Sequence, residues 1–358
     1  MRVCFGLFFG IAFFWSCQTK KQEIVVLQEE QLNTDLSSVG KSKLSDYGFF
    51  TGDLKNLSPS EGVIPYALNS ALFTDYAFKK RFVKFPFGTK ANYNSEEVLD
   101  FPEGTVLIKN FYYPADFRKP EENLRILETR LLLKESGIWK ALPYIWNDEQ
   151  TDAFLNVAGK NLDVTWTHRD GEVRTIKYSV PNMNQCNGCH LKGDVVMPIG
   201  PSVRQLNDDY HYPEGKMNQL IHWQELKLIE GMPAQSQLPQ LASYDDGQVS
   251  IDKRARAWLE INCAHCHRVD GPAKNSGLHL LASEKELAKI GVGKAPVAAG
   301  KGSGGLLYDI VPGKPEESIL QFRIESIHPG IMMPELGRST VHKEGVELVR
   351  KWISEMKM

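Results

Sequence analysis

The sequence lacks an excess of charge of either sign. Its 358 residues include 42 lysines and arginines against 44 aspartates and glutamates, which gives a formal net charge of −2. A protein whose main partner is nucleic acid carries a basic patch or stripe, and the sequence has none. The charge balance therefore argues against nucleic acid as a partner.

Long apolar runs are also absent after the first residues. Hydrophobic residues make up 42% of the chain and charged residues 24%, as in ordinary globular proteins. This composition excludes a disordered chain, a collagen and a protein with several membrane spans. The length favours two domains, each with a sizeable core.

The one apolar run follows Arg2 and covers residues 3–15. A helix that spans a bilayer needs about 18 apolar residues, whereas the apolar region of a signal peptide needs about 7 to 15. We therefore interpret residues 1–16 as a signal peptide and the protein as exported.

The end of this segment, Ser16-Cys17, resembles the cleavage box of a bacterial lipoprotein. The resemblance implies that Cys17 carries a lipid anchor, that polar residues 17–45 form a tether, and that the protein lies on the periplasmic side as an outer-membrane lipoprotein. Ordinary signal cleavage, with Cys17 left as a spare thiol, is the alternative.

Cysteines for a disulfide are lacking. Cys4 is removed with the signal peptide and Cys17 takes the lipid, so four of the six cysteines remain. They form two pairs, each followed directly by histidine: Cys186-Asn187-Gly188-Cys189-His190 and Cys263-Ala264-His265-Cys266-His267. In this spacing two thiols can bond to the vinyl groups of one haem while the adjacent histidine ligates its iron.

Two other uses of the paired cysteines are less suitable. A zinc site built from both pairs would separate them by about 15 to 20 residues, whereas 73 residues separate Cys189 from Cys263. A thioredoxin-like motif would not explain the two histidines. The motifs therefore predict two covalently attached c-type haems, with His190 and His267 as iron ligands.

The order of features around the second motif is that of a known cytochrome class. Residues 251–261 have helical periodicity and lead into the motif. Met332-Met333-Pro334 follows about 65 residues later. A terminal helix is expected to begin near Ser339 and Thr340, with Val346, Val349, Ile353 and Met356 on its apolar face. This arrangement resembles a class I cytochrome c domain. The resemblance implies an all-α domain in which Met333, or alternatively Met332, is the distal ligand of the second haem.

The N-terminal half has the pattern of strands. Residues 103–109 and 130–133 are short runs rich in branched residues, and residues 164–178 alternate around Asp170-Gly171, which indicates a hairpin with a type I′ turn. The stretch 101–109, the tryptophan-containing hairpin and the first motif resemble the cytochrome P460 and cytochrome c′-β group. That resemblance implies an open distal face at the first haem. Its sixth ligand stays open, with Met197, Met183, His211, Met217, His222 and Met232 as candidates.

The mature chain as a whole resembles a family of bacterial dihaem c-type cytochromes, many of them lipoproteins, with no known electron donor or acceptor. The expected fold class is α+β, with a β-rich haem domain followed by an all-α class I cytochrome c-like domain. The expected boundaries are 1–16 for the signal peptide, 17–45 for the tether, 46–199 for the β-rich domain, 200–248 for a connector and 249–358 for the cytochrome c-like domain.

The expected function is electron transfer through both haems to redox partner proteins whose identity the sequence does not indicate. The protein is expected to be an electron carrier rather than a catalyst. The alternative is a haem enzyme or sensor that binds peroxide, nitric oxide or hydroxylamine at an open first haem and uses the second haem as a relay.

Overall fold

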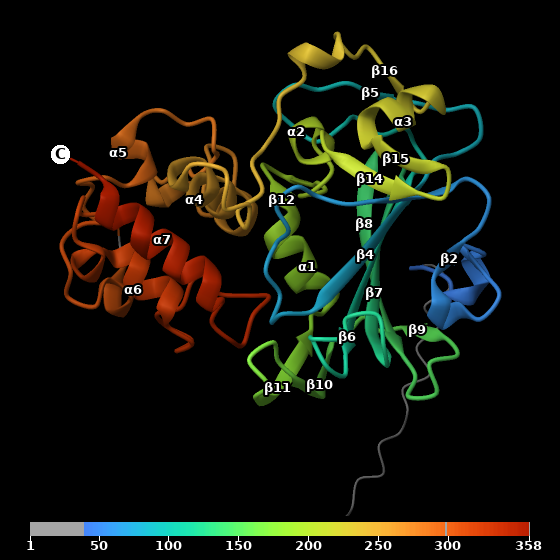
Figure 1. The fold of residues 1–358 in the computed structure, drawn as a ribbon, viewed down its shortest axis with the longest axis horizontal. Coiled ribbons are helices and arrows are strands. Elements are labelled where there is room, and N and C mark those ends of the chain that lie inside the picture. The colour runs from blue at the N-terminus through green and yellow to red at the C-terminus, as the bar shows by residue number, and fades with distance from the viewer. Residues whose placement is uncertain (1–38, 298, 358) are drawn as a thin grey trace, which may run out of the picture.

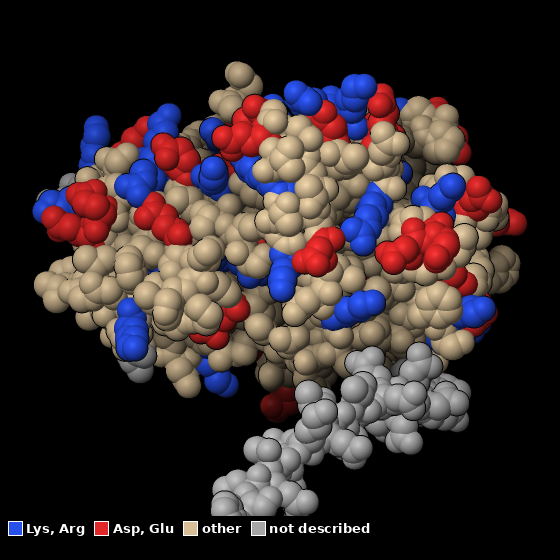
Figure 2. All heavy atoms as spheres, turned by 90° about the horizontal axis from the view of Figure 1, so that it is seen from below, with Lys and Arg blue, Asp and Glu red and all other residues tan. Residues whose placement is uncertain are grey.

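The computed structural model describes residues 39–297 and 299–357 (Figure 1). The predicted signal peptide 1–16, the predicted lipid acceptor Cys17 and residues 18–38 of the predicted tether lie outside the described residues. Among the described residues, no helix combines the length and the apolar character that crossing a membrane requires. On the face shown in Figure 2, basic and acidic side chains are interspersed, without a continuous patch of one sign.

The centre of the β-rich part is a six-stranded antiparallel sheet with the order β3-β4-β6-β7-β8-β9, so β3 and β9 are its edges. Its strands are β3 (Val63–Tyr66), β4 (Phe78–Lys84), β6 (Val106–Pro114), β7 (Leu124–Glu135), β8 (Ile138–Trp146) and β9 (Ala153–Leu155). The predicted strand at 103–109 overlaps β6, which begins only at Val106, and the predicted strand at 130–133 falls within β7; branched and aromatic side chains favour extended backbone in both.

One face of this sheet carries a continuous apolar core. Alternate residues of neighbouring strands, such as Phe82, Ile108 and Leu131, point to the same side because side chains alternate along a strand. The last residues of the predicted tether contribute to this core. Leu44 is 1% exposed, and its backbone N–H donates to the Ala153 carbonyl at 2.9 Å.

The opposite face is apolar at its two ends and polar in the middle. At one end it packs on α2 (Val203–Leu206) and α3 (Gln219–Glu225) through Leu206, Leu220 and Trp223. At the other end it packs on the hairpin of β10 (Lys160–Thr167) and β11 (Val173–Val180). Between them lies α1 (Met183–His190), which carries the first Cys-x-x-Cys-His motif (Figure 1).

The predicted hairpin is confirmed, but its predicted type I′ turn is wrong. Strands β10 and β11 pair in register from Lys160–Val180 to Thr167–Val173, so the loop has five residues. Only Gly171 in this loop has a positive φ, of 86°, whereas a type I′ turn needs positive φ at both central residues. The Asp170 carboxylate accepts the Glu172 N–H at 3.0 Å and stabilises the longer loop.

Short strand pairs complete the β-rich part. Antiparallel pairs join β1 (Phe50–Thr51) to β2 (Ser58–Pro59), β12 (Leu191–Lys192) to β13 (Val195–Val196), and β14 (Asp209–Tyr212) to β15 (Gly215–Asn218). Strand β16 (Ile229–Glu230) pairs in parallel with β5 (Ala91–Asn92). This last pair joins the predicted connector to the loop that precedes β6.

The predicted all-α, class I cytochrome c-like domain at the C-terminus is wrong. The structure is β-rich, with 28% strand and 24% helix, and the described residues contain only seven short α-helices. Those after residue 249 are α4 (Ile251–Leu259), α5 (Leu287–Ile290), α6 (Ile319–Glu325) and α7 (Lys343–Glu355). Loops separate them, and the one between α5 and α6 contains seven glycines from 291 to 313, a composition that disfavours helix.

Residues 249–357, called the C-terminal segment below, still have their own apolar core. The predicted helix at 251–261 is present as α4, followed by a π-helical turn at Glu260–Ala264, and Trp258 of α4 packs on α7. Gly345 allows this close approach, since a Cβ at this position would clash with the Trp258 indole. The predicted helix start at Ser339 and Thr340 is wrong, because α7 begins only at Lys343.

Ser339 and Thr340 instead join the C-terminal segment to the β-rich part. Their backbone N–H groups and hydroxyls donate to the Asp75 carboxylate at 2.7–2.9 Å. Nearby, the rings of Phe73 and His342 stack with centroids 4.3 Å apart. The two parts are thus held together by partly buried hydrogen bonds as well as by packing.

Candidate functional site

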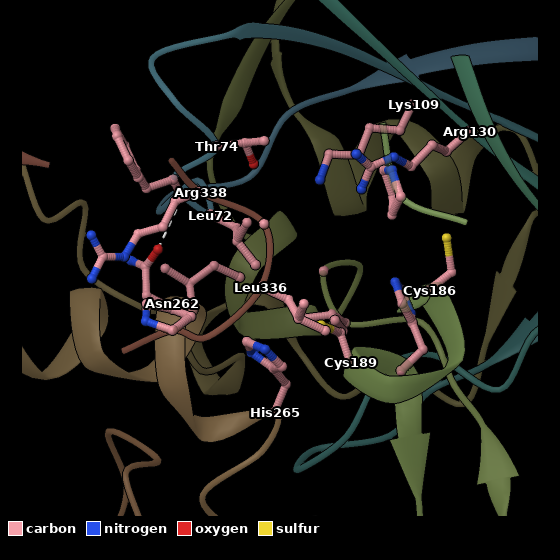
Figure 3. A pocket seen from close by; sticks show the side chains of 18 of the residues that line it. Leu72, Thr74, Lys109, Arg130, Cys186, Cys189, Asn262, His265, Leu336 and Arg338 are labelled. Atoms are coloured by element: carbon pink, nitrogen blue, oxygen red, sulfur yellow. Dashed lines mark hydrogen bonds between the residues drawn. The ribbon is translucent and has the colours of Figure 1, made fainter. Parts of the chain in front are cut away.

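A cavity of about 310 Å³ lies between the polar middle of the sheet, helix α1 and the C-terminal segment. Figure 3 shows Lys109 and Arg130 entering it from the sheet, Cys186 and Cys189 from α1, and His265 from the C-terminal segment. Its volume is within the usual range for small-molecule and cofactor sites, about 300–1,000 Å³.

Helix α1 positions the first motif. Asn182 caps the helix, because its side chain accepts the Gln185 N–H at 2.8 Å while the Gln185 side chain accepts the Asn182 N–H at 3.0 Å. Cys186 is buried and Cys189 partly buried, and both are free thiols that line the cavity. Burial raises the pKa of both thiols, so they stay protonated near neutral pH.

His190 has the orientation and charge of a metal ligand. Its Nδ1 lies 2.7 Å from the Met197 carbonyl. Because a carbonyl only accepts, Nδ1 must carry the proton and Nε2 keeps a free lone pair. Burial lowers the pKa of His190 to about 4, so the imidazole is neutral at pH 7.

The contact between His190 and Met197 also indicates whether Met197 can be the sixth ligand at the first motif. The backbone of Met197 forms two hydrogen bonds with His190. Its carbonyl accepts from His190 Nδ1, and its N–H donates to the His190 carbonyl at 2.8 Å. It therefore lies beside the proximal histidine and not opposite to it. The other sequence candidates do not line the cavity; they are Met183, His211, Met217, His222 and Met232.

The second motif repeats this arrangement with a different acceptor. His267 Nδ1 lies 2.9 Å from Ser276 Oγ, and that hydroxyl donates to the Ala273 carbonyl at 2.7 Å. The serine oxygen is thus an acceptor for Nδ1–H, which again leaves Nε2 free. Burial lowers the pKa of His267 to about 4 and raises that of Cys263 to about 12.

Met333 lines the same cavity as the first motif, whereas Cys263, Cys266 and His267 do not. The backbone of Met333 is held by α6 and the following loop: its N–H donates to the Arg323 carbonyl at 3.1 Å, and its carbonyl accepts from Arg338 at 2.9 Å. The structure therefore brings Cys186, Cys189, His190 and Met333 together around one cavity.

The chain segments that follow the two motifs are in direct contact. Gly193 N–H donates to the Asp270 carbonyl at 2.7 Å. Lys192 and Arg268 both form ion pairs with Glu97 and with Asp270. Burial raises the pKa of Glu97, but the hydrogen bonds from Arg268 and Lys192 outweigh this and lower it. Glu97, Lys192, Arg268 and Asp270 thus form one network of ion pairs, called the clamp below. Three of its members follow one of the two histidines within three residues.

His265 was not identified from the sequence, where it stands inside the second motif as one of the two intervening residues. In the structure it lines the cavity, and its buried Nδ1 has no hydrogen-bond partner among the described residues. Burial, then the nearby His190 and His267, lower its pKa to about 4. Its position between the motifs depends on contacts distant in sequence, so no local signal could have identified it.

These residues fit a covalently attached haem. Each motif offers two free thiols and one neutral histidine whose Nδ1 is already bonded and whose Nε2 is available to iron. Within residues 39–297 and 299–357, no cluster of three or more His, Cys, Asp and Glu side chains could hold a bare metal ion. A haem iron takes its equatorial ligands from the porphyrin, so that finding does not test the haem hypothesis.

Comparison with known proteins gave no match: no family model matches the chain, and neither a curated protein nor a solved structure does.

Proposed function

We propose that this protein is an exported dihaem c-type cytochrome that transfers electrons. Cys186, Cys189 and His190 would hold the first haem, and Cys263, Cys266 and His267 the second. The observation that carries the proposal is that both histidines are oriented alike, with Nδ1 donating to a fixed acceptor and Nε2 left available. A haem held in this way supplies an iron that gains or loses one electron.

The protein residues around the motifs would orient the ligands and set their surroundings. The Met197 carbonyl and the Ser276 hydroxyl fix the two imidazole rings. The clamp of Glu97, Lys192, Arg268 and Asp270 keeps the two motifs near each other. Such a connection would support electron exchange between the two haems. Cys17 would tether the protein to the membrane on the periplasmic side, and a redox partner protein would exchange electrons with one of the haems.

The number of haems per chain tests this proposal. We expect the protein produced in a host with a cytochrome c maturation system to contain two covalent haems. The double variants Cys186→Ala/Cys189→Ala and Cys263→Ala/Cys266→Ala should each contain one, because each removes the attachment of a single group. Pyridine haemochrome spectra and intact mass measure the number directly. A wild-type protein without covalent haem would overturn the proposal.

A second test concerns Met333. If it ligates iron opposite a histidine, Met333→Ala should abolish the near-infrared methionine-to-iron band and lower one midpoint potential, since methionine ligation raises it. Met332→Ala is the matched control and should leave both unchanged. The reverse result would assign the ligand to Met332.

EPR of the wild type separates the two candidate functions: two low-spin haems favour an electron carrier, and one high-spin haem favours the binding of small ligands in the cavity.

A further inference from the structure

Three basic residues form a row across the polar middle of the sheet. Arg81 of β4 pairs in register with Lys109 of β6, which pairs with Arg130 of β7. Directly paired residues point to the same face, and neighbouring strands are about 4.8 Å apart. All three side chains line the cavity. These three residues are called the cation row below.

Most of the charge in the cation row is not neutralised. Arg81 is 8% exposed, and its buried Nη2 has no hydrogen-bond partner among the described residues. The Lys109 side chain forms no hydrogen bond or ion pair within the described part of the chain, and its ammonium lies over the Phe111 ring, 4.7 Å from the centroid. Only Arg130 has a carboxylate partner, which is Glu128.

The remaining acidic groups that line the cavity, Asp75 and Glu335, are not among the main charges that act on the pKa of Arg81 or of Lys109. The Asp75 carboxylate already accepts from the backbone and hydroxyls of Ser339 and Thr340. Glu335 lies on the cavity rim and is exposed to solvent. The cation row is therefore a cavity-lining site with three basic side chains, of which Arg81 is buried and Lys109 and Arg130 are half-buried, and with Glu128 as its carboxylate partner.

Such an arrangement is unfavourable unless something else binds there. Like charges directly opposite each other on neighbouring strands destabilise a sheet, and a charge without a partner in a poorly solvated place destabilises the fold further. Burial, followed by Arg81, Lys79 and Arg130, lowers the pKa of Lys109 well below its usual value. A bound anion would relieve both the repulsion and the missing hydrogen bonds, because guanidinium groups bind carboxylates and oxyanions with two donors at once.

We propose that the cation row binds an oxygen anion inside the cavity, with Arg81 and Lys109 as its main donors. Two sources have this chemistry: a small free oxyanion such as nitrite, or the carboxylates of the haem at the first motif. The second source rests on the proposed function, whereas the first does not.

The test is a calorimetric titration of the protein, as purified with its bound groups, with sodium nitrite and with sodium sulfate at constant ionic strength. The same titrations are repeated on the Cys186→Ala/Cys189→Ala variant, which lacks the first attachment site. Arg81→Gln and Lys109→Met are then introduced into whichever protein binds. Lys80→Gln is the matched control, because Lys80 lies on the same strand with its ammonium 5.8 Å from the Tyr112 ring, on the other face of the sheet.

Binding by the wild type that weakens at least tenfold in Arg81→Gln and Lys109→Met, but not in Lys80→Gln, supports a free oxyanion. Binding only by the cysteine variant, with the same dependence on Arg81 and Lys109, supports haem carboxylates as the natural occupant. If neither protein binds, or if binding is insensitive to both substitutions, the proposal is wrong. Should Arg81→Gln fail to fold, the comparison of Lys109→Met with Lys80→Gln decides by the same criterion. A wild type without haem that still binds nitrite would refute the proposed function and leave this site intact.

Discussion

Replacing Glu128 by Ala should lower the free energy of unfolding by roughly 3–5 kcal/mol, the usual cost of removing one partner from a buried ion pair. The Glu128 side chain is 0% exposed and accepts from Arg130 Nε at 2.8 Å and from the Tyr178 hydroxyl at 2.6 Å. Its removal leaves the half-buried Arg130 guanidinium without a carboxylate partner, beside Arg81 and Lys109. The loss of one carboxylate therefore adds repulsion as well as removing attraction.

Urea denaturation followed by circular dichroism measures this effect. Tyr178→Phe is the matched control, because it removes one hydrogen bond to the same carboxylate and should cost about 1.5–3 kcal/mol. If Glu128→Ala costs no more than Tyr178→Phe, the charge on Arg130 is neutralised by some other group, and the account of the cation row fails with it.

The second large effect is expected at Asp75. This residue is 3% exposed and has a φ of 48°, a conformation that Asp and Asn tolerate better than other non-glycine residues. Asp75→Asn therefore keeps the backbone conformation, but it removes the charge and turns an NH₂ group towards the donors of Ser339 and Thr340. Because hydrogen bonds to a charged group contribute about 1.5–3 kcal/mol each, we expect a loss of about 2–4 kcal/mol.

Hydrogen exchange locates this loss in the molecule. Amides of Ser339, Thr340 and α7 should exchange faster in Asp75→Asn, while those of the central strands β6 and β7 should change little. Asp170→Asn is the control, since it removes a hairpin carboxylate that is partly exposed to solvent. Uniform loss of protection throughout the chain would show that Asp75 stabilises the fold as a whole and not this junction.

The motifs and the strand pattern could be predicted from the sequence because both are local. The spacing within Cys186–His190 and Cys263–His267 is read directly from adjacent residues, and the hairpin at 164–178 follows from alternation over two neighbouring strands. The type I′ turn was wrong because Asp170-Gly171 is also compatible with a longer loop in which only Gly171 adopts positive φ.

The features that shape the cavity depend on pairing between distant residues. Arg81, Lys109 and Arg130 are ordinary polar strand positions in the sequence, and only the register of β4, β6 and β7 places them side by side. Ser339 and Thr340 have the chemistry of helix caps, but Asp75, more than 260 positions earlier, uses their donors instead. The all-α prediction failed for a related reason, since amphipathic α4 and α7 do not determine the glycine-rich loops between the helices.

The two edges of the central sheet limit how another chain can bind to it. At β9, residues 42–44 occupy the outer side: Leu44 N–H donates to Ala153 at 2.9 Å, and Leu155 N–H donates to Ser42 at 3.0 Å. At β3, Val63 N–H already donates to Ser60, Pro65 has no N–H, and Ala67 N–H donates to the Gln219 side chain at 2.7 Å.

Neither edge therefore offers a row of free backbone donors, which is the template that strand addition requires. The sheet is protected against edge-to-edge aggregation and against β-augmentation by a peptide. A chain that binds at either edge of this sheet would have to contact side chains and loops, so its recognition would depend on shape and charge and could be altered by single surface substitutions.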